Sequence, residues 1–393
     1  MINKNKYTLG TERSAIRELY EYGKKQAELI GSENVFDFSL GNPSIPAPNE
    51  INQAICDIIY NRSPLETHGY TSAQGLLKTR TAIANSLNNR FNAEAEPDEI
   101  YITCGAAAAL CCIIGALTID NSTEFVAIAP YFPEYKVFVE QAGAKLRVCK
   151  ADQESFQINF KELEKAINKN TAAVIINSPN NPSGRVYSEQ TLLELSKVLK
   201  QKSDEFGHTI YIISDEPYRE LVYENITVPY IPNFYNNTVI CYSYSKSLSL
   251  PGERIGYFYV PSCADENKAL FAAAAGTGRS LGYVCAPSLM QQVITICTDV
   301  KPNIEEYTKN RDLLLSELTS YGYECATPDG AFYLFVKAPN GSGAKFSEKA
   351  KQKNILIVPG DSFGCPEYVR ISYCVPYDTI MRALPYFKEL IEC

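Results

Sequence analysis

Residues 243–257 read Ser-Tyr-Ser-Lys-Ser-Leu-Ser-Leu-Pro-Gly-Glu-Arg-Ile-Gly-Tyr and place Lys246 in a hydroxyl-rich loop, eight residues before Arg254. The amine of such a lysine can form an imine with an aldehyde, while hydroxyl groups and a guanidinium hold a phosphate. A lysine among serines is more often part of a solvated loop. The stretch therefore predicts a site for a phosphorylated aldehyde if the chain also supplies a side chain that pairs with the rest of that molecule.

An apolar run that ends in a carboxylate lies upstream of this loop. Residues 210–218 read Ile-Tyr-Ile-Ile-Ser-Asp-Glu-Pro-Tyr, which predicts a buried strand with Asp215 at its end and Tyr218 on the loop after it. Pyridoxal phosphate acts as an electron sink when a lysine Schiff base and a partner for its pyridinium nitrogen are in place. We therefore predict Lys246, Asp215 and Tyr218 as catalytic residues and pyridoxal 5'-phosphate as the cofactor.

The composition narrows the functional class. At 393 residues the chain exceeds the ceiling of about 250–300 residues for one hydrophobic core, so two domains are expected. A formal net charge of −8 argues against a nucleic-acid partner, which needs a basic surface. The odd number of cysteines, 13, the lack of a C-x-x-C pair and the lack of a signal-like leader before Tyr7 favour a reduced cytoplasm.

Histidine is scarce in this chain. His68 and His208 are its two histidines, and they lie far apart in the sequence. Zinc sites and serine or cysteine triads normally recruit histidine, so we predict no metal site. The general base must then be another residue, and Lys246 released from its imine is the natural candidate.

The segment Ile102–Ile119 permits two interpretations. It is nearly uncharged and 18 residues long, the lower limit for a membrane-spanning helix. Alternatively, Thr103 ends a short strand and the Gly/Ala-rich run from Gly105 opens a buried helix. We favour the second interpretation, because the free N–H groups and the dipole of a helix start form an anion site that would suit the cofactor phosphate.

Short apolar runs bounded by turn residues recur from about Glu99 to Tyr259, and helical stretches such as Glu189–Phe206 separate several of them. This alternation predicts an α/β fold whose large domain has a mainly parallel sheet between helices. Ligands of such a sheet gather at the carboxyl ends of its strands. The expected strands are Val126–Ala129, Thr171–Ile176, Ile210–Ser214, Thr238–Cys241 and Ile255–Val260.

The two ends of the chain follow a different pattern. Near the start, a helix-like stretch, Ser14–Leu29, precedes an extended run, Val35–Leu40. Near the end, helices are expected at 304–321, at 345–353 and at the terminus, and extended runs at 332–336, 355–358 and 369–372. We therefore predict a large domain of residues 47–299 and a smaller α+β domain built from residues 1–46 and 300–393.

Five motifs follow one another in the chain: Asn177–Gly184, Asp215 with Tyr218, the Lys246 loop, Arg254 and Val369–Ser372. In this order they resemble the class I/II aminotransferases, which have the aspartate aminotransferase fold of fold type I pyridoxal phosphate enzymes. The resemblance runs from about Phe38 to the C-terminus. It implies a sheet of the seven-stranded type and the transfer of an amino group from an L-amino acid to a 2-oxo acid, through a lysine Schiff base and pyridoxamine phosphate.

The resemblance also implies contacts to the cofactor. Asp215 resembles the partner of the pyridinium nitrogen, and Asn181 and Tyr218 resemble the residues that bond O3′. Phe132 lies where an aromatic side chain stacks on the ring, often tryptophan in relatives, and this chain has no tryptophan. The implied phosphate contacts are Gly105, Ala106, Ala107, Ser243, Ser245 and Arg254.

Further matches concern the substrate and the assembly. Arg370 resembles the arginine that grips the substrate carboxylate bidentately, near Asn181 and the backbone of Gly41. Tyr70 resembles a tyrosine that crosses a dimer interface to the phosphate, which implies a homodimer with shared active sites. Because the chain has 27 tyrosines, ordinary core packing is the alternative for Tyr70. Arg279 is either a reader of the substrate side chain or a structural arginine, and the donor and acceptor stay open.

Other functions remain open. Carbon–sulfur lyases, cyclising lyases and amino-acid oxidases of the same fold would use the same cofactor residues. The ligand-sensing domain of a transcription regulator can borrow this fold, but about forty residues before Gly41 leave little room for a DNA-binding module. A nicotinamide dehydrogenase is disfavoured, because no G-x-G-x-x-G joins a strand to a helix.

Overall fold

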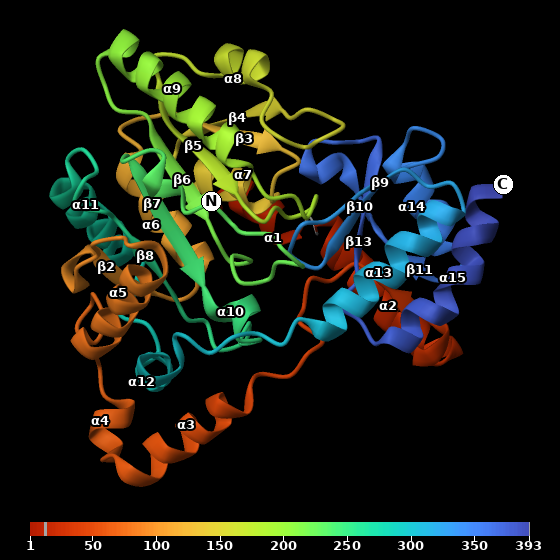
Figure 1. The fold of residues 1–393 in the computed structure, drawn as a ribbon, viewed down its shortest axis with the longest axis horizontal. Helices are drawn as coiled ribbons and strands as arrows, with labels where there is room; N and C mark the ends of the chain where they lie inside the picture. Colours follow the sequence, from red (N-terminus) through yellow and green to blue (C-terminus); the bar gives the residue numbers. More distant parts are fainter. Residues whose placement is uncertain (12–13, 393) are drawn as a thin grey trace.

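A seven-stranded sheet forms the centre of the molecule (Figure 1). The computed structural model describes residues 1–11 and 14–392. The strand order is β2-β8-β7-β6-β5-β3-β4, in which β8 runs antiparallel to both neighbours and every other pair is parallel. The mainly parallel, seven-stranded sheet is thus confirmed. Its strands are β2 (Ile100–Thr103), β3 (Glu124–Ala129), β4 (Lys145–Lys150), β5 (Thr171–Asn177), β6 (Tyr211–Asp215), β7 (Thr238–Ser243) and β8 (Gly256–Tyr259).

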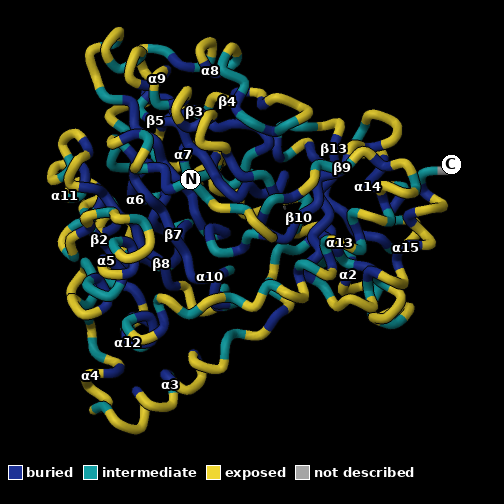
Figure 2. Tube along the Cα trace, viewed as in Figure 1, coloured by how far each residue is buried: buried dark blue, intermediate teal, exposed yellow. Residues whose placement is uncertain are grey.

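Helices cover both faces of this sheet, because successive residues of a buried strand point to opposite sides. On β5, Ala173 and Ile175 pack with α6, α7 and α11, whereas Val174 and Ile176 pack with α8 and α9. Figure 2 shows the strands as a dark, buried layer inside partly exposed helices. The helices of this domain are α3 (Asn49–Asn61), α4 (Pro64–His68), α5 (Leu77–Phe91), α6 (Ala106–Leu117), α7 (Glu134–Gln141), α8 (Phe160–Ala166), α9 (Glu189–Phe206), α10 (Tyr244–Ser247), α11 (Asn267–Ser280) and α12 (Ser288–Cys297).

Segments from the N-terminal and C-terminal parts of the chain pack together in a second, smaller α+β unit, as expected from the sequence (Figure 1). Near the N-terminus β1 (Phe36–Asp37) pairs in parallel with β11 (Ile355–Leu356). A four-stranded antiparallel sheet has the order β12-β13-β10-β9. The domain boundaries at 46/47 and 299/300 stay a prediction. The other elements of this unit are β9 (Cys325–Ala326), β10 (Tyr333–Lys337), β12 (Val358–Pro359), β13 (Tyr368–Ser372), α2 (Ala15–Ile30), α13 (Glu305–Ser320), α14 (Gly343–Lys351) and α15 (Tyr377–Glu392). The first helix, α1 (Lys4–Thr11), buries none of its residues.

Short 3₁₀ helices connect several elements of both units. They are η1 (Ser32–Asn34), η2 (Pro97–Glu99), η3 (Ile231–Asn233) and η4 (Gly360–Phe363).

The ambiguous segment Ile102–Ile119 divides between β2 and the twelve-residue α6, with a turn at Cys104 and Gly105. Of the helices in residues 1–11 and 14–392, none is long and apolar enough to cross a membrane. The strand β4 was not predicted from the sequence. It lies at the edge of the sheet with one neighbour, so its charged residues stay exposed and it lacks the apolar run of a central strand.

Candidate active site

The carboxyl ends of three neighbouring parallel strands meet at one edge of the large sheet. β5 ends at Asn177, β6 at Asp215 and β7 at Ser243. A cavity of about 310 Å³ lies at this edge, and side chains of the second unit, among them Arg370 on β13, complete its lining. All the site residues predicted from the sequence line this cavity, except Gly105 and Tyr70.

Lys246 reaches the cavity from α10, the short helix that follows β7. Its Nζ donates a hydrogen bond to the carbonyl oxygen of Gly41, 2.5 Å away. Burial lowers the pKa of Lys246 to about 8; the electrostatic effect of Cys374 opposes this shift, and the positive charges of Arg370 and Arg254 add to it. An amine with this pKa can exchange a proton near neutral pH, which a nucleophile or general base requires.

Asp215 presents one satisfied and one unsatisfied oxygen. The hydroxyl of Tyr135 donates to Oδ2 at 2.6 Å, whereas Oδ1 is buried and has no hydrogen-bond partner. Burial raises the pKa of Asp215 to about 7, and the charge of Glu216 adds to this rise. A pyridinium N–H at Oδ1 would supply both the missing bond and a positive charge, so this carboxylate fits pyridoxal phosphate.

Arg370 is 2% exposed and lies at the second-domain side of the cavity. Its Nη1 donates to Oδ1 of Asn181 at 3.0 Å and its Nη2 to the carbonyl oxygen of Ser39 at 2.5 Å. The guanidinium packs over the ring of Tyr333, whose hydroxyl lies 2.9 Å from that of Tyr218. Its buried Nε has no partner, so the planar group retains a donor that suits a carboxylate.

The start of α6 combines with the Lys246 loop to form a place for an anion. Gly105 caps α6 with a φ of +86°, and no side chain caps the helix, so its first N–H groups stay free. A Cβ on Gly105 would lie 2.9 Å from Nη2 of Arg254, so glycine permits this close approach. The hydroxyls of Ser243 and Ser245 lie 2.7 Å apart at the same cavity. These donors fit a phosphate.

Besides Gly105, two residues considered in the sequence do not line the cavity. Tyr70 is 91% exposed, which overturns the alternative that it packs in the core. Its place on the surface leaves the interpretation as a dimer-interface residue untested. Arg279 is an exposed residue in the last turn of α11 and does not line the cavity of its own chain.

Sequence patterns assigned no role to three side chains of the site. Tyr135, in the first turn of α7, donates to Asp215, and its ring packs edge-on against that of Phe132 at a centroid distance of 5.7 Å. Asn177 donates to the carbonyl oxygen of Asp215 at 2.7 Å, and it begins the Asn-Pro motif. Tyr333 sits in an apolar run that carries no functional signal. Such contacts between distant segments follow from the tertiary structure alone.

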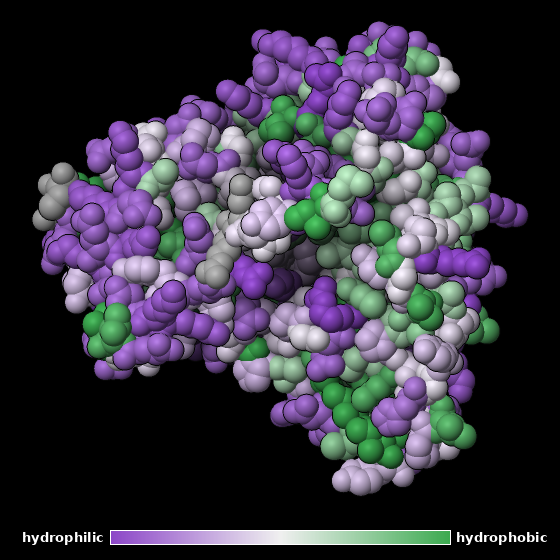
Figure 3. Space-filling model, turned by 180° about the vertical axis from the view of Figure 1, so that it is seen from behind, coloured by the Kyte–Doolittle hydropathy of each residue, from purple (hydrophilic) through white to green (hydrophobic). Residues whose placement is uncertain are grey.

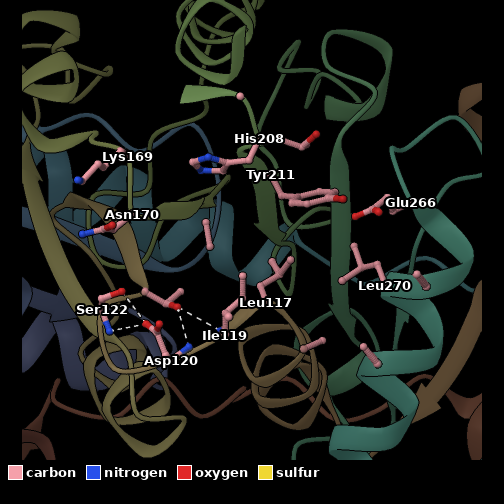
Figure 4. Close-up of a pocket in the computed structure, with 17 residues that line it drawn as sticks. Leu117, Ile119, Asp120, Ser122, Lys169, Asn170, His208, Tyr211, Glu266 and Leu270 are labelled. Carbon is pink, nitrogen blue, oxygen red and sulfur yellow. Dashed lines mark hydrogen bonds between the residues drawn. The ribbon is translucent and has the colours of Figure 1, made fainter. Parts of the chain in front are cut away.

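A larger cavity, of about 780 Å³, lies at the opposite edge of the sheet (Figure 4). It is lined by residues just before β3, β5 and β6, namely Thr123, Asn170 and Thr209. In Figure 4, Asp120 is bonded within its own turn: its Oδ1 accepts from the backbone N–H and the hydroxyl of Ser122. Among the described residues, none of the buried unpaired polar atoms lines this cavity.

Comparison with known proteins agrees with this geometry. The family model described as aminotransferase class I and II matches residues 33–386. The probable aspartate aminotransferase of Methanocaldococcus jannaschii is 28% identical over 388 residues, covering 96% of this chain and 97% of that relative. Aromatic-amino-acid aminotransferase 2 of Thermococcus litoralis is 28% identical over 395 residues, with 96% of each chain covered.

A solved structure gives the same result for the fold. The crystal structure of an amino transferase from Eubacterium rectale superposes with a TM-score of 0.98 and 55% identity, covering 100% of this chain and 98% of that one. The family match includes the loop of Lys246, the strand end at Asp215 and the strand of Arg370. The chain therefore belongs to the class I and II aminotransferases, a family of pyridoxal phosphate-dependent enzymes.

Proposed function

We propose that this chain moves an amino group from an L-amino acid to a 2-oxo acid with pyridoxal phosphate held by Lys246. One observation carries the proposal: a single cavity contains two buried polar atoms without partners, Oδ1 of Asp215 and Nε of Arg370. The first suits a protonated ring nitrogen and the second suits the carboxylate of an amino acid. The amine of Lys246 lines the same cavity.

Each side chain then has a separate task. Bound pyridoxal phosphate supplies an aldehyde for the amino group and a ring that withdraws electrons from Cα. Asp215 keeps the ring nitrogen protonated, and its own ionisation is restored by that positive charge. Arg370 orients the substrate by its carboxylate. Lys246, with its lowered pKa, accepts the proton from Cα at Nζ and so acts as the general base.

The donor is proposed from relatives and from the cavity together. The two relatives named above are called aspartate and aromatic-amino-acid aminotransferases. The cations that line this cavity are Lys246, Arg254 and Arg370, and each has a task in the proposal. Arg279 lies outside it. Whether aspartate is a donor therefore depends on the cations that a partner subunit brings to the site, and the screen described below decides it.

The active species is proposed to be a homodimer in the cytoplasm. Large apolar side chains are exposed around Tyr70, and Figure 3 shows a green patch at the lower end of the molecule, where Figure 1 places α3, α4 and α12. An apolar patch of this kind supports association. Free thiols at all twelve described cysteines fit a reducing compartment. The exposed residues are Ile59, Tyr60, Leu65, Tyr70, Leu77, Val284 and Ile296.

The test is a single-turnover screen of the twenty amino acids against the protein loaded with pyridoxal phosphate. We expect a 2-oxo acid from each accepted donor, conversion of the cofactor to its amino form, and full reversal by a second 2-oxo acid. Borohydride should fix the cofactor on Lys246, as read by peptide mass. Lys246→Ala serves as the control and should show neither reduction product nor turnover.

Two outcomes would contradict the proposal. Release of pyruvate and ammonia without an acceptor would make the chain a lyase of the same fold. A reducible cofactor linkage that persists in Lys246→Ala would mean that another lysine holds the cofactor.

A further inference from the structure

Four successive backbone carbonyls, at residues 38–41, each accept a hydrogen bond from a different group. The carbonyl of Phe38 accepts from the N–H of Ser372 at 2.9 Å, and that of Ser39 accepts from Nη2 of Arg370 at 2.5 Å. The donors to the other two carbonyls are a thiol and an amine. Sγ of Cys374 lies 3.5 Å from the carbonyl oxygen of Leu40, and Nζ of Lys246 lies 2.5 Å from that of Gly41.

The segment 38–41 therefore connects the two ends of the active site. Arg370, Ser372 and Cys374 come from β13 and the residues after it, whereas Lys246 comes from α10 of the large domain. The segment has little room to move at Gly41, because a Cβ there would lie 1.9 Å from the hydroxyl of Tyr333. The position of segment 38–41 is thus determined by tight packing and by one hydrogen-bond donor for each of its four carbonyl oxygens.

Of the three side chains that donate to this segment, Cys374 is the one to which the proposed mechanism gives no task. Its thiol is 5% exposed, and the hydroxyl of Ser372 lies 2.9 Å from its sulfur. Burial raises the pKa of Cys374 to about 11, although the nearby charges of Lys246 and Arg370 oppose the rise. The thiol therefore keeps its proton at neutral pH. With the hydroxyl of Ser372 donating to sulfur, that proton is left for the carbonyl of Leu40.

We propose that Cys374 is a positioning residue for Lys246: it holds the Leu40–Gly41 peptide so that the carbonyl of Gly41 faces the amine. The inference rests on the proposed role of Lys246. A carbonyl held in this place favours the protonated amine, so the contact opposes the effect of burial on Lys246. Loss of the thiol lets the peptide move and weakens the contact, although Cys374 itself touches no reacting atom.

The test measures how readily Lys246 reacts in the full-length chain without cofactor. Trace acetylation across a pH series, read on the Lys246 peptide by mass spectrometry, gives the titration midpoint of this amine. Cys374→Ala and Cys374→Val remove the donor, and valine keeps the volume filled. For both we expect the midpoint to fall by about 0.5–1 unit, the equivalent of one ordinary hydrogen bond. Cys374→Ser retains a donor and should keep the parental midpoint.

Cys297 provides a matched control. It is another buried thiol that contacts a backbone carbonyl, that of Glu50 at 3.7 Å, but it lies on α12 outside the cavity. Cys297→Ala should leave the Lys246 midpoint unchanged. An unchanged midpoint in Cys374→Val, or equal shifts in the serine and valine variants, would overturn the proposal, as would an equal shift in Cys297→Ala.

The outcome is separable from the proposed function. The labelling experiment contains neither cofactor nor substrate, so the expected shifts support the positioning role even if the chain fails to transaminate. Conversely, a chain that transaminates while Cys374→Val keeps the parental midpoint retains its function and excludes this role.

Discussion

Two cavities lie at opposite edges of the large sheet, and the smaller one contains the candidate site residues. The cavity at the carboxyl edge has about 310 Å³ and the one at the amino edge about 780 Å³. The smaller one contains a buried carboxylate and a buried guanidinium with unpaired atoms. The larger one is lined by exposed groups such as His208 and Lys169 (Figure 4). Buried polar atoms that lack a partner identify a binding site better than volume does.

The difference has a cause in the topology. Every parallel strand is followed by a loop at the same edge, and these loops can carry chemically active side chains over a rigid sheet. The second domain then packs over this edge and buries them. The amino-edge cavity is lined by residues of the large domain alone, and several of its polar groups, such as His208 and Lys169, are exposed. Burial therefore distinguishes the carboxyl edge, where the candidate site lies, from the amino edge.

The largest effect is expected from Asp215→Ala. The variant should bind pyridoxal phosphate yet lose several orders of magnitude in turnover, because the ring nitrogen no longer keeps its proton. Cofactor absorbance and single-turnover rates measure the two quantities separately. A rate within about threefold of the parent would remove Asp215 from its proposed role.

Arg370→Lys should have the next largest effect. Lysine keeps the charge but loses the planar fork, so kcat/KM should fall by about 10²-fold for all donors alike, if two charge-assisted bonds of about 1.5–3 kcal/mol each are weakened. Arg279→Lys, outside the cavity, is the matched control and should be active with every donor. A loss confined to one donor would make the substituted arginine a reader of the substrate side chain.

Tyr70→Ala tests whether the carboxyl-edge cavity is complete in one chain. Loss of one charge-assisted bond to the phosphate should weaken cofactor binding by about 10–10²-fold. In hybrids with Lys246→Ala chains, the site of the Tyr70→Ala subunit has its own Lys246 and receives Tyr70 from the partner. Activity at limiting cofactor should therefore return. An active monomer, or inactive hybrids shown to form, would contradict a shared site.

Asp215 should also make the cofactor-free chain sensitive to pH. Its pKa rises from 3.8 in the unfolded chain to about 7 in the folded one. The folded state therefore binds a proton that the unfolded state loses above about pH 4, and this contribution to stability falls as the pH rises from about 4 through about 7. In urea titrations, the free energy of unfolding of Asp215→Asn should fall less than that of the parent between about pH 4 and about pH 7. If the free energy of unfolding changed with pH in the same way in both proteins, a group other than Asp215 would dominate the pH dependence.

The smallest effect belongs to the amino-edge cavity. His208→Ala removes a ring whose Nε2 lies 3.0 Å from the carbonyl oxygen of Thr171, on an exposed edge. We expect kcat/KM within about twofold of the parent, since surface substitutions away from a site have small effects. A loss as large as that of Arg370→Lys would mean that the two edges of the sheet are coupled.

Much of the fold was readable from local patterns. The runs that became β3, β5, β6, β7 and β8 are apolar and bounded by turns, and α9 matches its expected range, Glu189–Phe206. The edge strand β4 was not readable, because an exposed strand needs no apolar run. The candidate site residues were also readable: Lys246, Asp215 and Arg370 each lie in a sequence motif, and all three line one cavity.

The sequence by itself determined which groups are present and at which strand ends they emerge, since periodicity and turn residues are local properties. The tertiary structure alone decided what these groups face. Tyr135 bonds Asp215 across 80 residues of chain, and Lys246 meets the carbonyl of Gly41 across 205. Such contacts depend on long-range packing. So does the burial that lowers the pKa of Lys246 and raises that of Asp215. No local pattern encodes them, because desolvation is a property of everything that surrounds a side chain.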